Sequence, residues 1–119
     1  MARQTHTPVQ LLGPYPTLQP AADAVSKAAV AAIFADKEEV ALTGGEIVIA
    51  YNTGAGARTV TFTSVADDKK RTGDITAYSI DAGSHAIFGP FAVPGWQQTN
   101  GKLYFEAEHA EVKFVVLKP

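Results

Sequence analysis

Short runs in which apolar and polar residues alternate fill the chain from Val40 onward, and they predict a series of β-strands. The clearest run is residues 58–65, in which Val60 and Phe62 face one side and the threonines between them face the other. Residues 46–51 are apolar on both faces, which predicts a central strand, and the glycine-containing turn after them predicts a hairpin with residues 58–65. Further strands are expected at residues 74–80, 85–88, 102–106 and 111–117.

These strands recur at intervals of roughly ten residues, which is typical of an all-β sandwich or barrel. We therefore expect a compact antiparallel β-sandwich or barrel of seven to eight short strands. Residues 21–42 are harder to assign, because their alanine content favours a helix while the surrounding strands favour a further strand. The interpretation preferred here is a strand around residues 24–32.

The first twenty residues follow a different pattern, with prolines at positions 8, 14, 16 and 20. Each proline removes a backbone donor and favours extended geometry in the residue before it, so neither a helix nor a central strand is expected here. The sequence thus predicts an extended N-terminal arm over residues 1–20 and a single β-sandwich domain over residues 21–119. Apolar side chains on an extended arm need a surface to lie on, either the arm's own domain or a neighbouring subunit. The residues expected to make this contact are Val9, Leu11, Leu12, Pro14, Tyr15, Pro16 and Leu18.

Composition narrows the possible functions. The chain has 119 residues, enough for one domain, and its formal net charge of −2 gives no basic excess for binding a nucleic-acid backbone. It has no cysteine, so disulfides, zinc–thiolate sites and thiol nucleophiles are excluded. The longest apolar run, residues 28–35, is too short to span a membrane, and residues 1–6 lack the hydrophobic region of a signal peptide. We expect a soluble domain made in the cytoplasm.

The polar residues form no recognisable catalytic pattern. None of the serines lies in a GxSxG motif, and the glycine pairs lie in turns rather than between a strand and a helix. His109 is flanked by Glu106, Glu108 and Glu111, a set that could hold a metal ion, but a single histidine in a polar turn is more typical of a solvated surface. We therefore expect no enzymatic activity, no cofactor and no metal site.

The segment from Phe88 to Trp96 combines aromatic residues with glycines and prolines, which predicts an irregular loop. The favoured interpretation is that the loop folds back and closes one end of the sandwich. The alternative is a contact surface, because aromatic residues often anchor interfaces. The residues of that possible interface loop are Phe88, Phe91, Val93 and Trp96.

Blocks of sequence distributed over most of the chain carry a family resemblance. They are LLGPYP (11–16), GEIVIAYNTGA (45–55), TVTFTS (59–64), RTGDI (71–75), FGPF (88–91), GWQQ (95–98), GKLYFEA (101–107) and HAEVKF (109–114). With these blocks the chain resembles small structural proteins of tailed bacteriophages, which are typically encoded among the head genes. The resemblance implies a virion protein, made in the host bacterial cytoplasm, that binds the capsid surface as a decoration or cement protein. The partners it implies are the major capsid protein and further copies of the chain, with no nucleic acid and no membrane.

Two other functions remain open at this point. The chain could be a head–tail connector or a tail component of the same kind of particle. From a different class, it could be a carbohydrate-binding or hydrolytic β-sandwich in which Trp96, Tyr104 and Tyr78 form a platform for stacking sugars.

Overall fold

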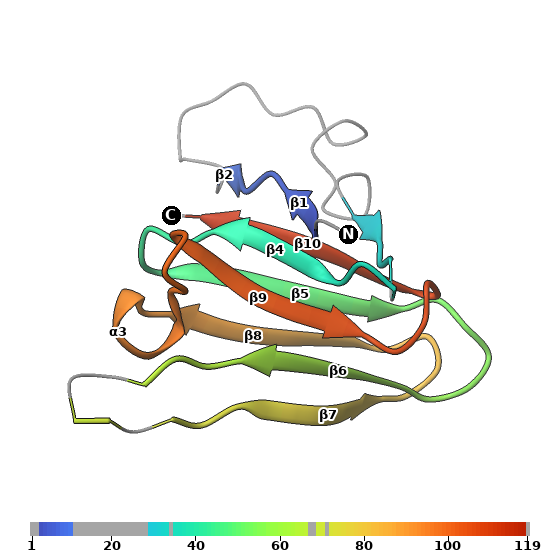
Figure 1. Cartoon of the computed structure of the whole chain (residues 1–119). Coiled ribbons are helices and arrows are strands. Elements are labelled where there is room, and N and C mark those ends of the chain that lie inside the picture. Colours follow the sequence, from blue (N-terminus) through green and yellow to red (C-terminus); the bar gives the residue numbers. More distant parts are fainter. Residues whose placement is uncertain (1–2, 11–28, 34, 67–68, 71, 119) are drawn as a thin grey trace.

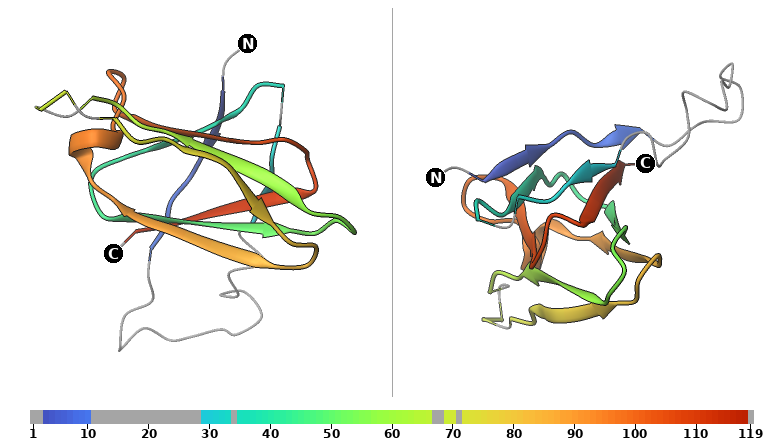
Figure 2. Two further views of the ribbon diagram at one scale, coloured as in Figure 1. Left: turned by 90° about the horizontal axis from the view of Figure 1, so that it is seen from below. Right: turned by 90° about the vertical axis from the view of Figure 1, so that its right-hand side faces the viewer.

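The computed structural model describes residues 3–10, 29–33, 35–66, 69–70 and 72–118, which form a β-sandwich of two facing sheets (Figures 1 and 2). The first sheet has the order β1 (Gln4–His6), β4 (Glu38–Ala41), β9 (Lys102–Ala107), β6 (Arg58–Thr63) and β7 (Ile75–Ile80). The second sheet has the order β2 (Val9–Gln10), β10 (Val112–Lys118), β5 (Glu46–Asn52) and β8 (His85–Phe91), with β3 (Val30–Ala31) also paired to β10.

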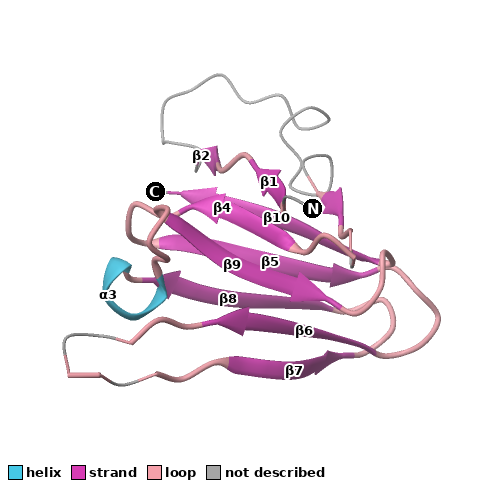
Figure 3. Cartoon of the chain, in the orientation of Figure 1, coloured by secondary structure: helices cyan, strands magenta, loops and turns pink. Residues whose placement is uncertain are grey.

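The all-β prediction is confirmed, since the described residues hold strands and only one short helical turn, α3 (Val93–Trp96) (Figure 3). Neighbouring strands are antiparallel, except that β1 runs parallel to β4 and β2 runs parallel to β10. The strand predicted to be central is central, because β5 lies between β10 and β8.

The predicted hairpin between residues 46–51 and 58–65 is wrong, because β5 and β6 belong to different sheets. The buried side chains of the two strands, such as Val48 on β5 and Phe62 on β6, face the same core from opposite sides. Alternation identifies the face that a strand buries, but it does not say whether the next strand lies beside it or across the core.

A buried side chain, Asn52, holds the chain where it crosses between the sheets. Its amide nitrogen donates to the carbonyls of Ile80 and Gly56, at 2.9 and 2.8 Å. Its amide oxygen accepts from the backbone N–H of Gly54 at 2.9 Å. These bonds satisfy the polar groups of the crossing, which would otherwise be costly to bury.

The core is built around Phe62, which is fully buried and touches aromatic rings from both sheets. Its ring centroid lies 4.6 Å from that of Phe88, 5.2 Å from Phe91 and 5.6 Å from Phe105. Phe105 in turn meets Phe114 edge to face at 4.8 Å, which ties β9 to β10 across the sandwich. The aromatic residues therefore join the two layers.

The first described residues of the predicted arm lie on their own domain as edge strands. Strand β1 pairs with β4, and His6 at its end is buried against Phe105 and Phe114. Strand β2 pairs with the last residues of β10. Edge positions suit a segment that contains prolines, since an edge strand leaves some backbone donors unused.

The short strand β3 falls within the range 24–32 that was expected to be a strand; residues 24–28 lie outside the described part of the chain. Within the described ranges, none of the helices is long and apolar enough to cross a membrane.

Candidate functional site

The two outer faces of the sandwich differ in character. On the first sheet, the residues that alternate with the buried ones on β6 and β9 are mostly polar: Thr59, Thr61, Thr63, Lys102, Tyr104 and Glu106. Charged side chains pair across this face, with Lys37 Nζ 3.6 Å from Glu106 Oε1 and Lys102 Nζ 4.0 Å from Glu39 Oε2. Such a face is suited to contact with water.

The outer face of the second sheet is apolar instead. The strand registers place side chains on it in three rows across the sheet. Those rows are Leu117 and Ile47, then Val115, Ile49 and Ile87, then Lys113, Tyr51 and His85. We call this surface the outer face of the second sheet. Its most exposed apolar side chain, Ile87, is 70% accessible to solvent.

A groove of about 270 Å³ lies on this face. Its walls are Ala29, Ile49, Tyr51, His85, Ile87, Lys113 and Val115. The rings of Tyr51 and His85 stack in parallel at 4.0 Å, with 4° between their planes. This ring pair lies in the same row across the sheet as Lys113, next to the row of Val115, Ile49 and Ile87.

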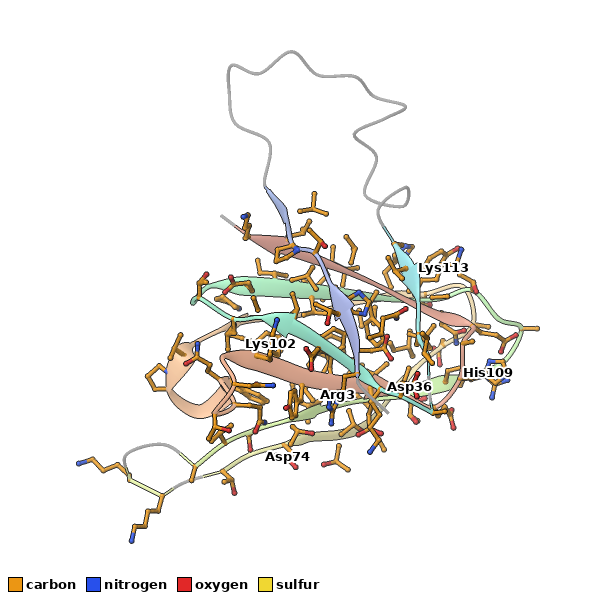
Figure 4. The ribbon with its side chains drawn as sticks, turned by 45° about the horizontal axis from the view of Figure 1, so that its top comes forward. Arg3, Asp36, Asp74, Lys102, His109 and Lys113 are labelled. Atoms are coloured by element: carbon orange, nitrogen blue, oxygen red, sulfur yellow. The ribbon has the colours of Figure 1, made fainter. Side chains whose placement is uncertain are left out.

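The polar end of the groove is basic. Lys113, which Figure 4 labels, is one of its walls. It forms no ion pair with any residue in the described ranges. None of the described residues that line the groove carries a carboxylate. Over its described residues, the groove thus combines apolar walls with a positive charge that no ion pair neutralises.

The residues predicted as an interface loop mostly close the end of the sandwich. Phe88 and Phe91 are buried in the core, so their side chains do not present a contact surface. Trp96 packs edge to face against Phe91 at 5.0 Å, and Val93 and Trp96 are half-buried. The segment from Phe88 to Trp96 therefore folds back on its own domain.

The predicted arm residues divide into two groups. Val9 lies in β2, where it pairs with Leu117 at one end of the outer face of the second sheet. The others lie outside the described residues: Leu11, Leu12, Pro14, Tyr15, Pro16 and Leu18.

The rings of the predicted sugar platform have separate partners. Tyr104 lies under the guanidinium of Arg3, 3.9 Å from its ring centroid. Tyr78 meets Phe88 edge to face at 5.4 Å, and Trp96 meets Phe91. Among the described residues, no ring contact joins two of these three side chains.

The acidic turn around His109 serves local structure. His109 Nδ1 accepts the backbone N–H of Glu111 at 3.0 Å, and the Glu111 carboxylate pairs with Arg58 at 2.8 Å. In the part of the chain that the structure describes, no group of three or more histidine and acidic residues is arranged to hold a metal ion.

The strand at the centre of the apolar face begins at a buried carboxylate, Glu46. The carboxylate accepts the Thr43 hydroxyl at 2.6 Å and the backbone N–H of Gly44 at 2.7 Å. Burial acts to raise the pKa of Glu46, but these hydrogen bonds and that from the Thr43 N–H outweigh it and hold the pKa below its ordinary value of 4.5. The ionised form therefore fixes the turn into β5.

We expect the domain to lose stability as the pH falls below about 4.5, the ordinary pKa of this carboxyl group. The folded-state pKa is lower than the unfolded one, so the stabilisation is complete above the unfolded pKa and is lost as the pH falls through the folded pKa. Urea unfolding of the wild type and Glu46→Gln at several pH values measures this, and Glu46→Gln is expected to show a shallower dependence. Asp74, whose pKa is lowered by hydrogen bonds from Ser64, acts in the same direction, so Asp74→Asn is the matched variant. An unchanged pH dependence in Glu46→Gln would contradict this role.

The outer face of the second sheet was not identified from the sequence, although a signal for it was present. Ile47, Ile49 and Tyr51 alternate with the buried residues Val48 and Ala50, so β5 is apolar on both sides. That pattern indicated a central strand. In a sandwich, however, a central strand needs only one apolar face for the core, and its second apolar face can contact another molecule.

Comparisons of the chain with protein-family models, curated proteins and solved structures find no match.

Proposed function

We propose that this chain is a non-enzymatic structural protein of a virion, which binds the capsid surface and stabilises the shell as a decoration protein. The observation that carries the proposal is the contrast between the two outer faces. One face is polar and internally paired, whereas the other is apolar and holds Lys113, which forms no ion pair within the described residues. On the apolar face, Ile87 is 70% exposed beside half-buried apolar neighbours, and we take this patch as a surface that another molecule covers. The resemblance of the sequence blocks to small phage head proteins supplies the kind of molecule.

Physical considerations favour a repetitive partner for such a domain. Burying apolar surface stabilises a complex by about 25 cal/mol per Å², but association and side-chain ordering offset much of that gain. A shell presents the same contact many times, and neighbouring copies that also touch one another bind with higher avidity. Modest contacts per copy can therefore produce firm attachment without a covalent link or a cofactor.

The proposal is tested by mixing the purified full chain with shells assembled from the major capsid protein that is encoded with it. We expect saturable co-sedimentation with the shells and an increase in the temperature at which the shells break open. Binding restricted to one vertex or to tails would favour the connector or tail function. Absence of shell binding, or a selective glycan in an array, would contradict the proposal.

A further inference from the structure

We infer that the groove on the outer face of the second sheet receives an apolar segment of a partner protein that also carries a carboxylate. The inference deepens the proposed function and rests on it only for the identity of the partner as the capsid protein. The chemistry of the occupant comes from the groove itself.

The groove is at the small end of the sizes seen for ligand sites. Its volume of about 270 Å³ is slightly below the range of about 300–1,000 Å³ that is typical of small-molecule sites. Ile87 stands at its rim with 70% of its surface exposed. The half-buried Ile49 and the buried Val115 continue the same row across the sheet. An aliphatic or aromatic side chain of a partner that lies on this row would bury Ile87 and extend the apolar contact.

The charge of the groove requires an acidic group in the partner. Covering Lys113 with a purely apolar surface would leave a desolvated ammonium without a counter-charge, which is unfavourable. A carboxylate at this end can pair with Lys113, and it can also accept a hydrogen bond from the ring N–H that His85 carries in either tautomer. Among the lining residues that the structure describes, none is acidic and could already fill this role.

The strand geometry sets the spacing within the occupant. Val115 and Lys113 are residues of the same strand and the same face, two positions apart, which is about 7 Å at the rise of a β-strand. An extended segment would therefore place its apolar anchor over the row of Ile49 and Ile87. Its carboxylate would follow about two residues away, roughly above Tyr51.

The experiment selects short random peptides from a displayed library against the full chain. We expect the enriched peptides to contain an aliphatic or aromatic residue close to Asp or Glu. Ile87→Lys is expected to weaken their binding by at least about tenfold, as for an anchor at the centre of an interface. Thr76→Lys is the control, because it adds the same side chain at an exposed position of the edge strand β7 in the other sheet. Circular dichroism and thermal unfolding verify that both variants are folded.

A charge reversal separates binding from a general effect on the fold. Lys113→Glu is expected to lose the acidic peptides and to select basic ones in their place, a change that structural damage would not produce. Enriched peptides without acidic residues, an unchanged preference in Lys113→Glu, or full binding by Ile87→Lys would each overturn the inference.

The same variants and peptides distinguish two other possible occupants of the groove, a second copy of the chain and the chain's own residues 11–28. Self-association in sedimentation that Ile87→Lys abolishes would assign the groove to a second copy. Peptide binding that appears only when residues 11–28 are replaced by a Gly-Ser linker would assign it to this chain's own segment. Either result would overturn the inference.

Shell binding then separates the inference from the proposed function. If the chain selects acidic, apolar peptides but does not bind shells, the proposed function fails and the groove chemistry stands. If Ile87→Lys binds shells as tightly as the wild type does, the groove is not the contact and the proposed function stands.

Discussion

Replacing Phe62 by alanine is expected to lower the free energy of unfolding by about 3–5 kcal/mol. The ring is fully buried and contacts Phe105 in its own sheet and Phe88 and Phe91 in the facing sheet. Its removal deletes apolar contacts from both layers and leaves a cavity that the strands can fill only in part. A loss of this size is a large share of the 5–15 kcal/mol that is typical of a small domain.

Chemical denaturation of the wild type and Phe62→Ala measures this loss, provided that both unfold in a single transition. Thr76→Ala is the control, because Thr76 is exposed on β7 and its truncation is expected to change stability by no more than about 0.5 kcal/mol. A loss below about 1 kcal/mol in Phe62→Ala would show that the two layers are not joined through this ring.

Replacing Glu38 by alanine is expected to destabilise the domain by about 3–5 kcal/mol, because several buried or part-buried donors lose their acceptor at about 1–3 kcal/mol each. The carboxyl group is fully buried and lies 3.1 Å from Nε2 of the buried His6. It also accepts hydrogen bonds from the side chain of Gln4 and, at 3.1 Å, from the backbone N–H of Ile33. Its removal leaves several donors without partners and loosens β1 from β4.

Glu39→Ala is the matched control for this variant. Glu39 is the next residue, but its carboxylate meets Thr5 and Lys102 at the surface, where such contacts contribute about 0–1 kcal/mol. Hydrogen exchange should show faster exchange over β1 in Glu38→Ala than in Glu39→Ala. Equal stability and equal exchange in the two variants would mean that Glu38 does not anchor the first strand.

Most of the fold could be predicted from local pattern, and the pairing of the strands could not. The alternation around Val60 and Phe62 identified both β6 and the side of it that faces the core. The connection after β5 was misinterpreted because glycine-containing turns are compatible with both a hairpin and a crossing between sheets. The side chain that holds the crossing, Asn52, bonds to Ile80, which is 28 positions away in sequence, so no local pattern could reveal it.

The N-terminal strands were missed for a related reason. Prolines and polar residues gave no strand signal around β1, and a three-residue edge strand is too short for periodicity to identify. Its position depends on the buried contact of His6 with Glu38, which joins residues 32 positions apart. Identifying the outer face of the second sheet requires both the local sequence pattern and the pairing of the strands. The apolar residues of β5 are visible in the sequence, whereas their alignment with Ile87 and Lys113 depends on the strand register.

The central claim is that this domain attaches to a shell through the outer face of its second sheet. An electron cryo-microscopy map of shells saturated with the full chain tests it most directly, because the map gives both the location and the orientation of each copy. The account predicts many copies over the shell surface, with Ile87 and Lys113 facing the capsid protein and the polar outer face of the first sheet directed to solvent. Bare shells, or copies whose first sheet faces the capsid protein, would contradict it.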